Sequence, residues 1–112
     1  MGRGEMNAVR SLLRRALEHL LKAAAWPDTP TARRWVHEAG VFLDDARDAW
    51  APSMAQRIVL GELYAKALAH VRDLAFEEGP PAPLPETCPV TLGDLITGDI
   101  LRDLAPRFRP PA

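Results

Sequence analysis

Apolar residues recur at helical spacing over a long stretch in the middle of the chain, from Ser53 to about Glu78. Ser53 and Gln56 form an S-x-x-Q pattern, which is typical of a capped helix start. The stretch carries a wide apolar stripe with polar residues on its other side, and the stripe consists of Ile58, Val59, Leu60, Leu63, Tyr64, Ala67, Leu68, Val71, Leu74 and Ala75. Nothing breaks the pattern before Gly79. It therefore predicts one continuous helix whose stripe the remaining segments must cover.

The N-terminal region predicts the first helix along the chain, from Met6 to about Ala25. Its apolar positions alternate steps of three and four residues, as in a helix packed along one side. They are Met6, Val9, Leu13, Ala16 and Leu20, broadened to one side by Leu12, Leu17 and Leu21. So broad a stripe predicts contact with more than one neighbour. Residues 1–5 are expected to be flexible.

The second helix along the chain is predicted from Pro30 to about Trp50. Pro27 lacks an amide hydrogen and ends the preceding helix, while Thr29 is a good N-cap with Pro30 at the first helical position. The apolar positions of this helix are Trp35, Val36, Ala39, Phe42, Leu43, Ala46 and Ala49. The connections on both sides of it are short, which favours antiparallel packing of consecutive helices.

Antiparallel packing also predicts which residues lie at the same level. Folding about Pro52 places Gly40 near Gly61, with Phe42 over Gly61. A glycine inside a helix costs about 1 kcal/mol relative to alanine, so close approach of the two backbones is the expected reason for both. Folding about Asp28 gives further neighbours, with Trp35 beside Leu20 and Leu21, and Arg10 and Arg14 toward Asp44 and Asp45.

Residues 79–90 contain five prolines and predict an extended, fairly stiff strap. Leu84 and Val90 are expected to anchor this strap to helix surfaces. Thr91 and Asp94 then resemble a capping box, with aspartate in the glutamate position, and predict a short helix.

That short helix is expected to end at Gly98, with Ile100, Leu101 and Leu104 placed for one further turn. Residues 106–112 are expected to form a flexible tail. The 112 residues are therefore predicted to form one all-α domain. Its architecture is an antiparallel helical bundle of three main helices, with a proline-rich strap and a short C-terminal helix.

Composition adds limits to this fold. Hydrophobic residues make up 47% of the chain, enough for a core, and the net charge is −1. A dominant nucleic-acid-binding role needs a strong basic excess, so nucleic acid is not the expected partner. Basic residues do gather near the start of the chain, at Arg3, Arg10, Arg14, Arg15 and Lys22. A nucleic-acid-associated regulator that uses this basic first helix therefore stays as an alternative.

Cys88 is the only cysteine, so no disulfide can form within the chain, which fits a reducing compartment. No apolar run approaches the roughly 18 residues of a membrane span. The first residues also lack the pattern of a signal peptide. We therefore expect a cytoplasmic protein without a membrane partner.

Several short segments resemble one family. They are His19-Leu20-Leu21-Lys22, Trp35, Pro52-Ser53, then Leu63, Tyr64 and Ala67, and finally Leu84-Pro85-Glu86-Thr87-Cys88-Pro89-Val90-Thr91-Leu92. The last of these is the most specific. On these residues the chain resembles domain of unknown function family twenty-nine, small bacterial all-helical proteins, over roughly residues 9–100. The resemblance implies an all-helical fold and supplies no activity.

The chain also departs from that family's pattern. Members usually carry an additional N-terminal segment before the His-Leu-Leu-Lys helix, and their tryptophan after the lysine is displaced here to Trp26. The middle of the second predicted helix reads Ala39-Gly40-Val41-Phe42 in place of a polar, basic stretch. A missing N-terminal helix leaves apolar surface to be covered otherwise, which favours self-association.

Histidines and aspartates supply weak site candidates. His70 and Asp73 have the spacing of two metal ligands on one helix face, but di-iron bundles use Glu-x-x-His, which does not occur here. His19, His37 and His70 are each better explained as helix-surface or interface residues. An acidic patch in the second predicted helix, Asp44, Asp45 and Asp48, would need a pocket that shifts one pKa before it could serve in acid–base catalysis.

Cys88 is the best single candidate for chemistry, because it precedes a helix N-terminus whose dipole would favour a thiolate. His19 or His70 would be its base. The alternative is a small apolar side chain that pins the strap to the bundle, as buried free cysteines often do. Three tryptophans at or near helix ends suit packing first and an interface second; these are Trp26, Trp35 and Trp50.

The sequence therefore predicts no catalytic, cofactor-binding or metal-binding residue, no cofactor, and no enzyme. Three helices with broad stripes have more apolar surface than one copy can bury, and a symmetric dimer is the commonest solution. We expect a non-enzymatic, homo-oligomeric protein-interaction module, with a dimer as the first expectation and a further protein partner as a second. The alternatives are the nucleic-acid-associated regulator and a thiol-based redox or enzymatic role at Cys88.

Overall fold

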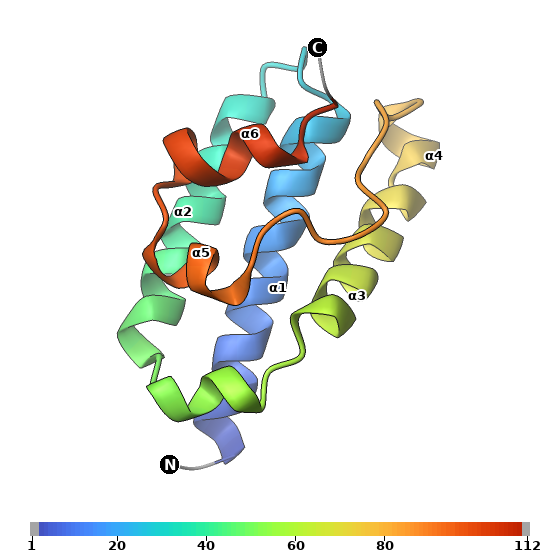
Figure 1. Cartoon of the computed structure of the whole chain (residues 1–112). Helices are drawn as coiled ribbons and strands as arrows, with labels where there is room; N and C mark the ends of the chain where they lie inside the picture. Colours follow the sequence, from blue (N-terminus) through green and yellow to red (C-terminus); the bar gives the residue numbers. More distant parts are fainter. Residues whose placement is uncertain (1–2, 111–112) are drawn as a thin grey trace.

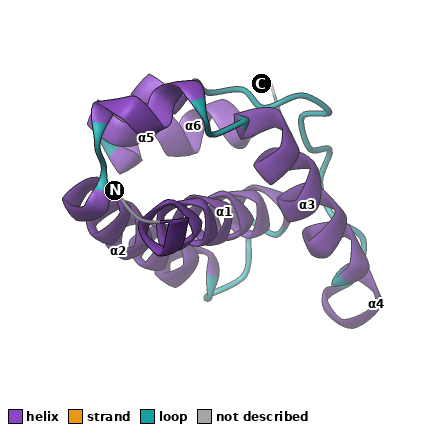
Figure 2. Cartoon of the chain, turned by 90° about the horizontal axis from the view of Figure 1, so that it is seen from below, coloured by secondary structure: helices purple, strands orange, loops and turns teal. Residues whose placement is uncertain are grey.

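The computed structural model describes residues 3–110, apart from the side chain of Phe76. Every regular element in this range is helical, which confirms the all-α fold class. The elements are α1 (Arg3–Ala25), α2 (Ala32–Ala49), η1 (Pro52–Gln56), α3 (Leu60–Asp73), α4 (Ala75–Glu78), α5 (Leu92–Thr97), η2 (Ile100–Leu104) and α6 (Ala105–Phe108). Figure 1 shows α1 between α2 and α3, and in Figure 2 the segment with α5 and α6 forms a second layer over α1.

The central helix α1 carries the apolar pattern that the sequence indicated. Its buried residues are Met6, Val9, Leu13, Ala16, Leu17, Leu20, Leu21, Ala24 and Ala25. The breadth of this stripe is explained by its neighbours, since α1 is the main packing partner of both α2 and α3. The helix already begins at Arg3, so the expectation that residues 1–5 are flexible is wrong for residues 3–5. Residues 1–2 lie outside the described range.

The second helix starts two residues later than predicted. α2 begins at Ala32, and the residue before it, Thr31, makes no capping hydrogen bond with its side chain. Thr29 is not the N-cap, because its hydroxyl donates to the carbonyl of Trp26 at 2.9 Å instead. That bond stabilises the turn after α1, so Thr29 terminates one helix rather than starting the next.

The long helix predicted from Ser53 to Glu78 is wrong as a single element. A 3-10 turn, η1, covers Pro52–Gln56, the chain is extended at Val59, and α3 and α4 are separate segments. The break has a tertiary cause, because the chain must pass across α1 to reach its other side (Figure 1). Arg10 of α1 holds this crossing by donating to the carbonyl of Arg57 at 3.1 Å.

The predicted contact between Gly40 and Gly61 is also wrong. A Cβ atom on Gly40 would lie 3.8 Å from Ile100, and one on Gly61 would meet nothing within 4 Å. Phe42 packs against the ring of His19, with 5.1 Å between the ring centroids. The reason is that α3 packs on α1 rather than on α2. The two helices on either side of Pro52 therefore do not form the antiparallel hairpin from which the contact was predicted.

The neighbours predicted by folding the chain about Asp28 are correct in part, because α1 and α2 do pack antiparallel (Figure 1). Trp35 is buried against the end of α1, with the Lys22 ammonium 5.1 Å from its ring and the Trp26 ring at 6.3 Å. The predicted charge pairs do not form. Arg10 bonds to Asn7 and the Arg57 carbonyl and Arg14 pairs with Glu18, in place of Asp44 and Asp45.

The strap, residues 79–90, is non-helical as predicted and is fixed by hydrogen bonds to α1, to the turn that follows α1, and to α3. The amide of Ala82 donates to the Ala25 carbonyl at 2.8 Å, and the indole of Trp26 donates to the Gly79 carbonyl at 3.0 Å. The hydroxyl of Tyr64 donates to the Pro85 carbonyl at 2.5 Å. The two predicted anchors also pack on the core, Val90 fully and Leu84 partly.

The C-terminal segment is more ordered than the sequence indicated. The Thr91–Asp94 capping box forms and starts α5. The flexible tail predicted for residues 106–112 is wrong at least as far as Phe108, because that side chain is completely buried and its ring lies 6.5 Å from that of Tyr64. Residues 111–112 lie outside the described range. Among the helices of residues 3–110, none is long and apolar enough to cross a bilayer.

Candidate functional site

His70 and Asp73, the candidate pair of metal ligands, lie exposed on the outer face of α3. Within residues 3–110, no group of three or more histidine, cysteine, aspartate or glutamate side chains is arranged to hold a metal ion. The structure therefore adds no third ligand to this pair.

The acidic patch of α2 is also open to solvent, since Asp44, Asp45 and Asp48 are all exposed. Catalytic carboxylates depend on a buried or strongly charged surrounding that moves one pKa. None of these three carboxylates is buried in this way. Of the three, Asp44 alone lies on the edge of the groove described below.

The other two histidines have separate surroundings. His19 ties α1 to α2, because its Nε2 lies 2.8 Å from a Glu38 carboxylate oxygen and its Nδ1 lies 2.9 Å from the Arg15 carbonyl. His37 is exposed on α2 and lines the groove. His19 therefore contributes to the packing of α1 against α2, whereas His37 lies on the surface.

Cys88 lies half-buried in the strap, and its thiol donates to the carbonyl of Val90 at 3.3 Å. Burial raises the pKa of the Cys88 thiol. The thiol form is therefore favoured, contrary to the thiolate expected from the helix dipole. No hydrogen bond or ion pair within the described residues joins Cys88 to a histidine.

The basic residues of α1 are largely occupied by contacts inside the molecule. Arg10 bonds to Arg57, Arg14 pairs with Glu18 at 3.7 Å, and the guanidinium of Arg15 lies 5.9 Å from the ring of Phe42.

The three tryptophans contribute to packing, as their first interpretation predicted. Trp26 and Trp35 are buried, and Trp50 is partly buried against the core. The Trp26 indole also bonds to the strap, so these side chains connect the ends of helices inside one copy.

A concave surface, a groove of about 780 Å³, lies between α2, the C-terminal half of α1, and the η2–α6 segment. Its floor and walls are apolar and mostly covered; they include Leu20, Ala24, Val36, Gly40, Ile100 and Ala105. Its rim is exposed and mixed in charge, with Arg33, His37, Asp44 and Arg109. No sequence motif marked this surface.

Two large apolar side chains on the groove's edge are exposed to an unusual degree. Val41 on α2 is 47% exposed and Leu101 on η2 is 68% exposed. Both line the groove. Apolar side chains that are exposed next to a concave apolar surface mark candidate binding surfaces.

One wall of the groove is held in place by Arg47 of α2. Its guanidinium donates to the Leu95 carbonyl at 2.8 Å and to the Gly98 carbonyl at 2.6 Å. Bonds from a charged donor are stronger than neutral ones, and these satisfy carbonyls at the end of α5. Arg47 therefore fixes α5, and the start of η2 after it, against α2.

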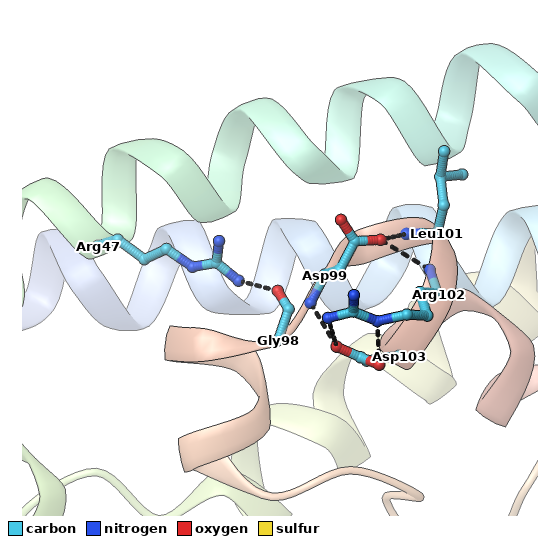
Figure 3. A network of polar contacts seen from close by, with 6 residues as sticks. All are labelled: Arg47, Gly98, Asp99, Leu101, Arg102 and Asp103. Carbon is cyan, nitrogen blue, oxygen red and sulfur yellow. Dashed lines mark hydrogen bonds and ion pairs between the residues drawn. The ribbon is translucent and has the colours of Figure 1, made fainter.

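The turn that follows is stabilised by its own polar network (Figure 3). A carboxylate oxygen of Asp99 accepts from the amides of Leu101 and Arg102, and Asp103 accepts from the amide of Asp99 at 2.9 Å. The Arg102 side chain and the Asp99 amide lower the pKa of Asp103 to about 2. The Leu101 side chain points away from this network (Figure 3), so the network orients an apolar residue outward.

The backbone of this wall is a π-helix over Ile100–Leu104. π-Helical turns are rare and occur frequently at functional sites. Their presence is difficult to detect from sequence, because Ile100, Leu101 and Leu104 fit one ordinary helical turn equally well.

Comparison with known proteins gives a family and one similar structure. The model of the family described as "Domain of unknown function DUF29" matches residues 1–101. The chain is also similar to the crystal structure of an alpha-helical protein of unknown function from Rhodospirillum rubrum, with 26% identity and a TM-score of 0.85. The match covers 98% of this chain and 72% of that one. A search of the curated proteins finds no match.

Proposed function

We propose that this chain, which belongs to the DUF29 family, is a non-enzymatic protein-interaction module that binds another protein chain in the groove between α2, α1 and the η2–α6 segment. The observation that carries the proposal is the exposure of Val41 and Leu101 beside an apolar floor. Exposed apolar area is costly in water, and its burial is the main favourable term in protein association.

The character of the rim supports binding rather than catalysis. The polar groups around the groove are exposed, whereas catalytic acids and bases are held in surroundings that perturb them. The half-buried Cys88 lies in the strap, and it is not among the residues that line the groove. The groove therefore offers apolar contact and charge, which suits recognition of a protein surface.

The rim also specifies what a partner must present. Apolar side chains must fill the floor. A negative group must lie near Arg33 or Arg109, and a positive group near Asp44, because buried charges without a partner weaken binding. The partner surface is thus apolar in its centre and carries opposite charges at its ends.

We place this module in a bacterial cytoplasm. The single cysteine forms no disulfide within the chain, which agrees with a reducing compartment, and the similar structure comes from Rhodospirillum rubrum.

A photo-cross-linking amino acid tests the groove directly. It replaces Val41 on the rim, and in a matched control it replaces Lys66, which is exposed on α3 away from the groove. In the cells that produce the protein, we expect protein adducts from position 41 and few from position 66, with the cross-linked peptides identified by mass spectrometry. Adducts that are absent at 41, or equal at both positions, would contradict the proposal.

A further inference from the structure

The surface that the groove requires of a partner is present on the chain itself. The groove-lining face of α2 carries an arginine near its start and an aspartate further on, with an exposed valine between them, and Leu101 projects beside it. Arg33 and Asp44 are eleven positions apart, roughly 16 Å at 1.5 Å per residue. Eleven residues complete about three helical turns, so both side chains lie on one face of α2.

We infer that the groove's partner is a second copy of the chain, docked about a twofold axis so that the two α2 helices run antiparallel across it. This inference rests on the proposed function and names the partner of the same site. In a twofold interface each contact occurs twice, because residue i faces residue j and residue j faces residue i. The arrangement can therefore be checked for every residue of α2 that lines the groove.

One register satisfies the whole face. If Arg33 faces Asp44 of the second copy, then Val36 faces Val41 and His37 faces Gly40. These six residues line the groove from α2, along with Ala32 at its end. A positive residue thus meets a negative one, an aliphatic side chain meets another, and an imidazole ring meets the residue that has no side chain.

This pairing also accounts for Gly40. A glycine inside a helix destabilises it relative to alanine. Inside one copy a Cβ atom at this position would be in ordinary contact, 3.8 Å from Ile100, so packing within the chain does not require glycine. In the antiparallel pair, the space at Gly40 admits the His37 ring of the second copy. The close approach that a helical glycine implies is then made between copies.

Leu101 supplies the second apolar contact. It is the most exposed large apolar side chain among those that the structure describes, and the polar network of Asp99 and Asp103 turns it outward. Beside the antiparallel α2 pair, this side chain from each copy enters the groove of the other. The interface then has an apolar centre with charge pairs at its edges, as specific interfaces do.

Charge reversal tests this register. We expect the unmodified chain to be a dimer at micromolar concentration in sedimentation experiments. Arg33→Glu and Asp44→Arg should each raise the dimer dissociation constant at least about tenfold, since each places like charges opposite one another twice. An equimolar mixture of the two variants should form heterodimers, because both contacts are then between opposite charges. The double variant R33E/D44R should also dimerise.

Two charge-matched controls lie on α2 but do not line the groove. Arg34→Glu repeats the first charge change and Asp48→Arg repeats the second, and both residues are exposed. Neither should change the dissociation constant by more than about twofold, since contacts between exposed surface charges contribute little. Circular dichroism of each variant confirms that its helical content is unchanged.

The outcomes separate this inference from the proposed function. If the chain stays monomeric but still gives adducts with other proteins from position 41, the inference that the partner is a second copy is wrong. The proposed protein-interaction function would then still hold. A dimer that Leu101→Asp disrupts, but in which R33E and D44R do not complement each other, overturns the antiparallel register alone. A monomer without adducts overturns both.

Discussion

The two sides of α1 are closed in different ways. On the α3 side, the strap and α6 lie over the helices, with Phe108 and Val90 buried and the Pro85 carbonyl bonded to Tyr64. On the α2 side, the same C-terminal segment is attached through Arg47, and an apolar groove stays open beside Val41. The two sides therefore differ in whether the chain itself covers them.

The closed side and the open side contribute differently to the free energy of folding. On the closed side, side chains are removed from water and backbone groups are paired, which contributes to the free energy of folding. On the open side, Val41 and Leu101 contribute little to the folding of one copy because they stay exposed. They are available to contribute to binding.

The largest expected effect is on the closed side. Phe108→Ala should lower the free energy of unfolding by about 3–5 kcal/mol, because it removes a completely buried ring from contact with Tyr64. Leu101→Ala, on the open side, should change it by less than about 0.5 kcal/mol. Urea denaturation of dilute protein measures both. If both variants lost the same free energy of unfolding, the two sides would not differ in their contribution to stability.

Arg47 attaches α5 and the start of η2 to α2 on the open side. Arg47→Met keeps the aliphatic stem but loses the hydrogen bonds to the Leu95 and Gly98 carbonyls, so we expect a loss of about 2 kcal/mol. Hydrogen exchange should increase in α5 and η2 and stay unchanged in α3. Arg34→Met is the control, since that side chain is 71% exposed on the same helix. A loss as large in the control, or protection unchanged in α5, would show that Arg47 does not hold this wall.

Tyr64 reports on the closed side through its ionisation. Burial, followed by the nearby Cys88, raises the pKa of Tyr64 from 10.0 to about 12. The folded state therefore disfavours the phenolate, so the contribution of this group to stability is complete below pH 10 and is lost as the pH rises toward 12. Tyr64 is the single tyrosine. Its phenolate absorbance should titrate near 12 in the folded chain and near 10 in urea. A folded midpoint near 10 would mean that the strap leaves the phenol open to water.

The removal of that hydroxyl is a smaller change. Tyr64→Phe deletes the hydrogen bond to the Pro85 carbonyl and should cost about 1 kcal/mol in urea denaturation. The variant should also lose part of the decline in stability between pH 10 and 12. A variant that is as stable as the parent at pH 7 would show that this bond adds nothing to the anchoring of the strap.

Gly40 should give the smallest effect and the sharpest contrast. Gly40→Ala should stabilise a single copy by about 0.5–1 kcal/mol, because a Cβ atom fits beside Ile100. It should also weaken the dimer, since the methyl group occupies the space inferred for His37. The control is Gly61→Ala, where a Cβ atom meets nothing within 4 Å on α3. That variant should not change the dissociation constant, and an equal weakening by both substitutions would contradict a specific role for Gly40.

The features that the sequence predicted correctly depend on neighbours in the chain. Steps of three and four residues give the buried face of α1, and five prolines prevent a helix in the strap. The Thr91–Asp94 capping box forms between residues three positions apart. Each of these depends on periodicity, on a missing amide hydrogen or on a bond within one turn, so the sequence suffices to predict it.

The incorrect predictions share another property. The split of the long helix before α3 follows from the crossing over α1, which Arg10 and Arg57 stabilise across 47 positions of sequence. Phe108 looks like part of a tail until α6 brings it to Tyr64. The groove also depends on distant segments, because its lining comes from α1, α2 and the η2–α6 segment. Ala39-Gly40-Val41-Phe42, which stands in place of a polar, basic stretch, does not by itself predict a groove.

The helical fold class, the family, the central stripe of α1, the strap and its cap can therefore all be predicted from the sequence. Contacts between distant segments are needed to show that α3 packs beside α1 instead of α2, that the last helix completes the core, and that α2 keeps one apolar face uncovered. The physical reason is that local conformation is set by interactions within a few residues, whereas burial is set by which distant segments compete for the same surface. Gly40 illustrates both kinds of interaction. Its cost to helix stability is local, whereas the side chain that a Cβ atom there would contact, Ile100, is sixty positions away.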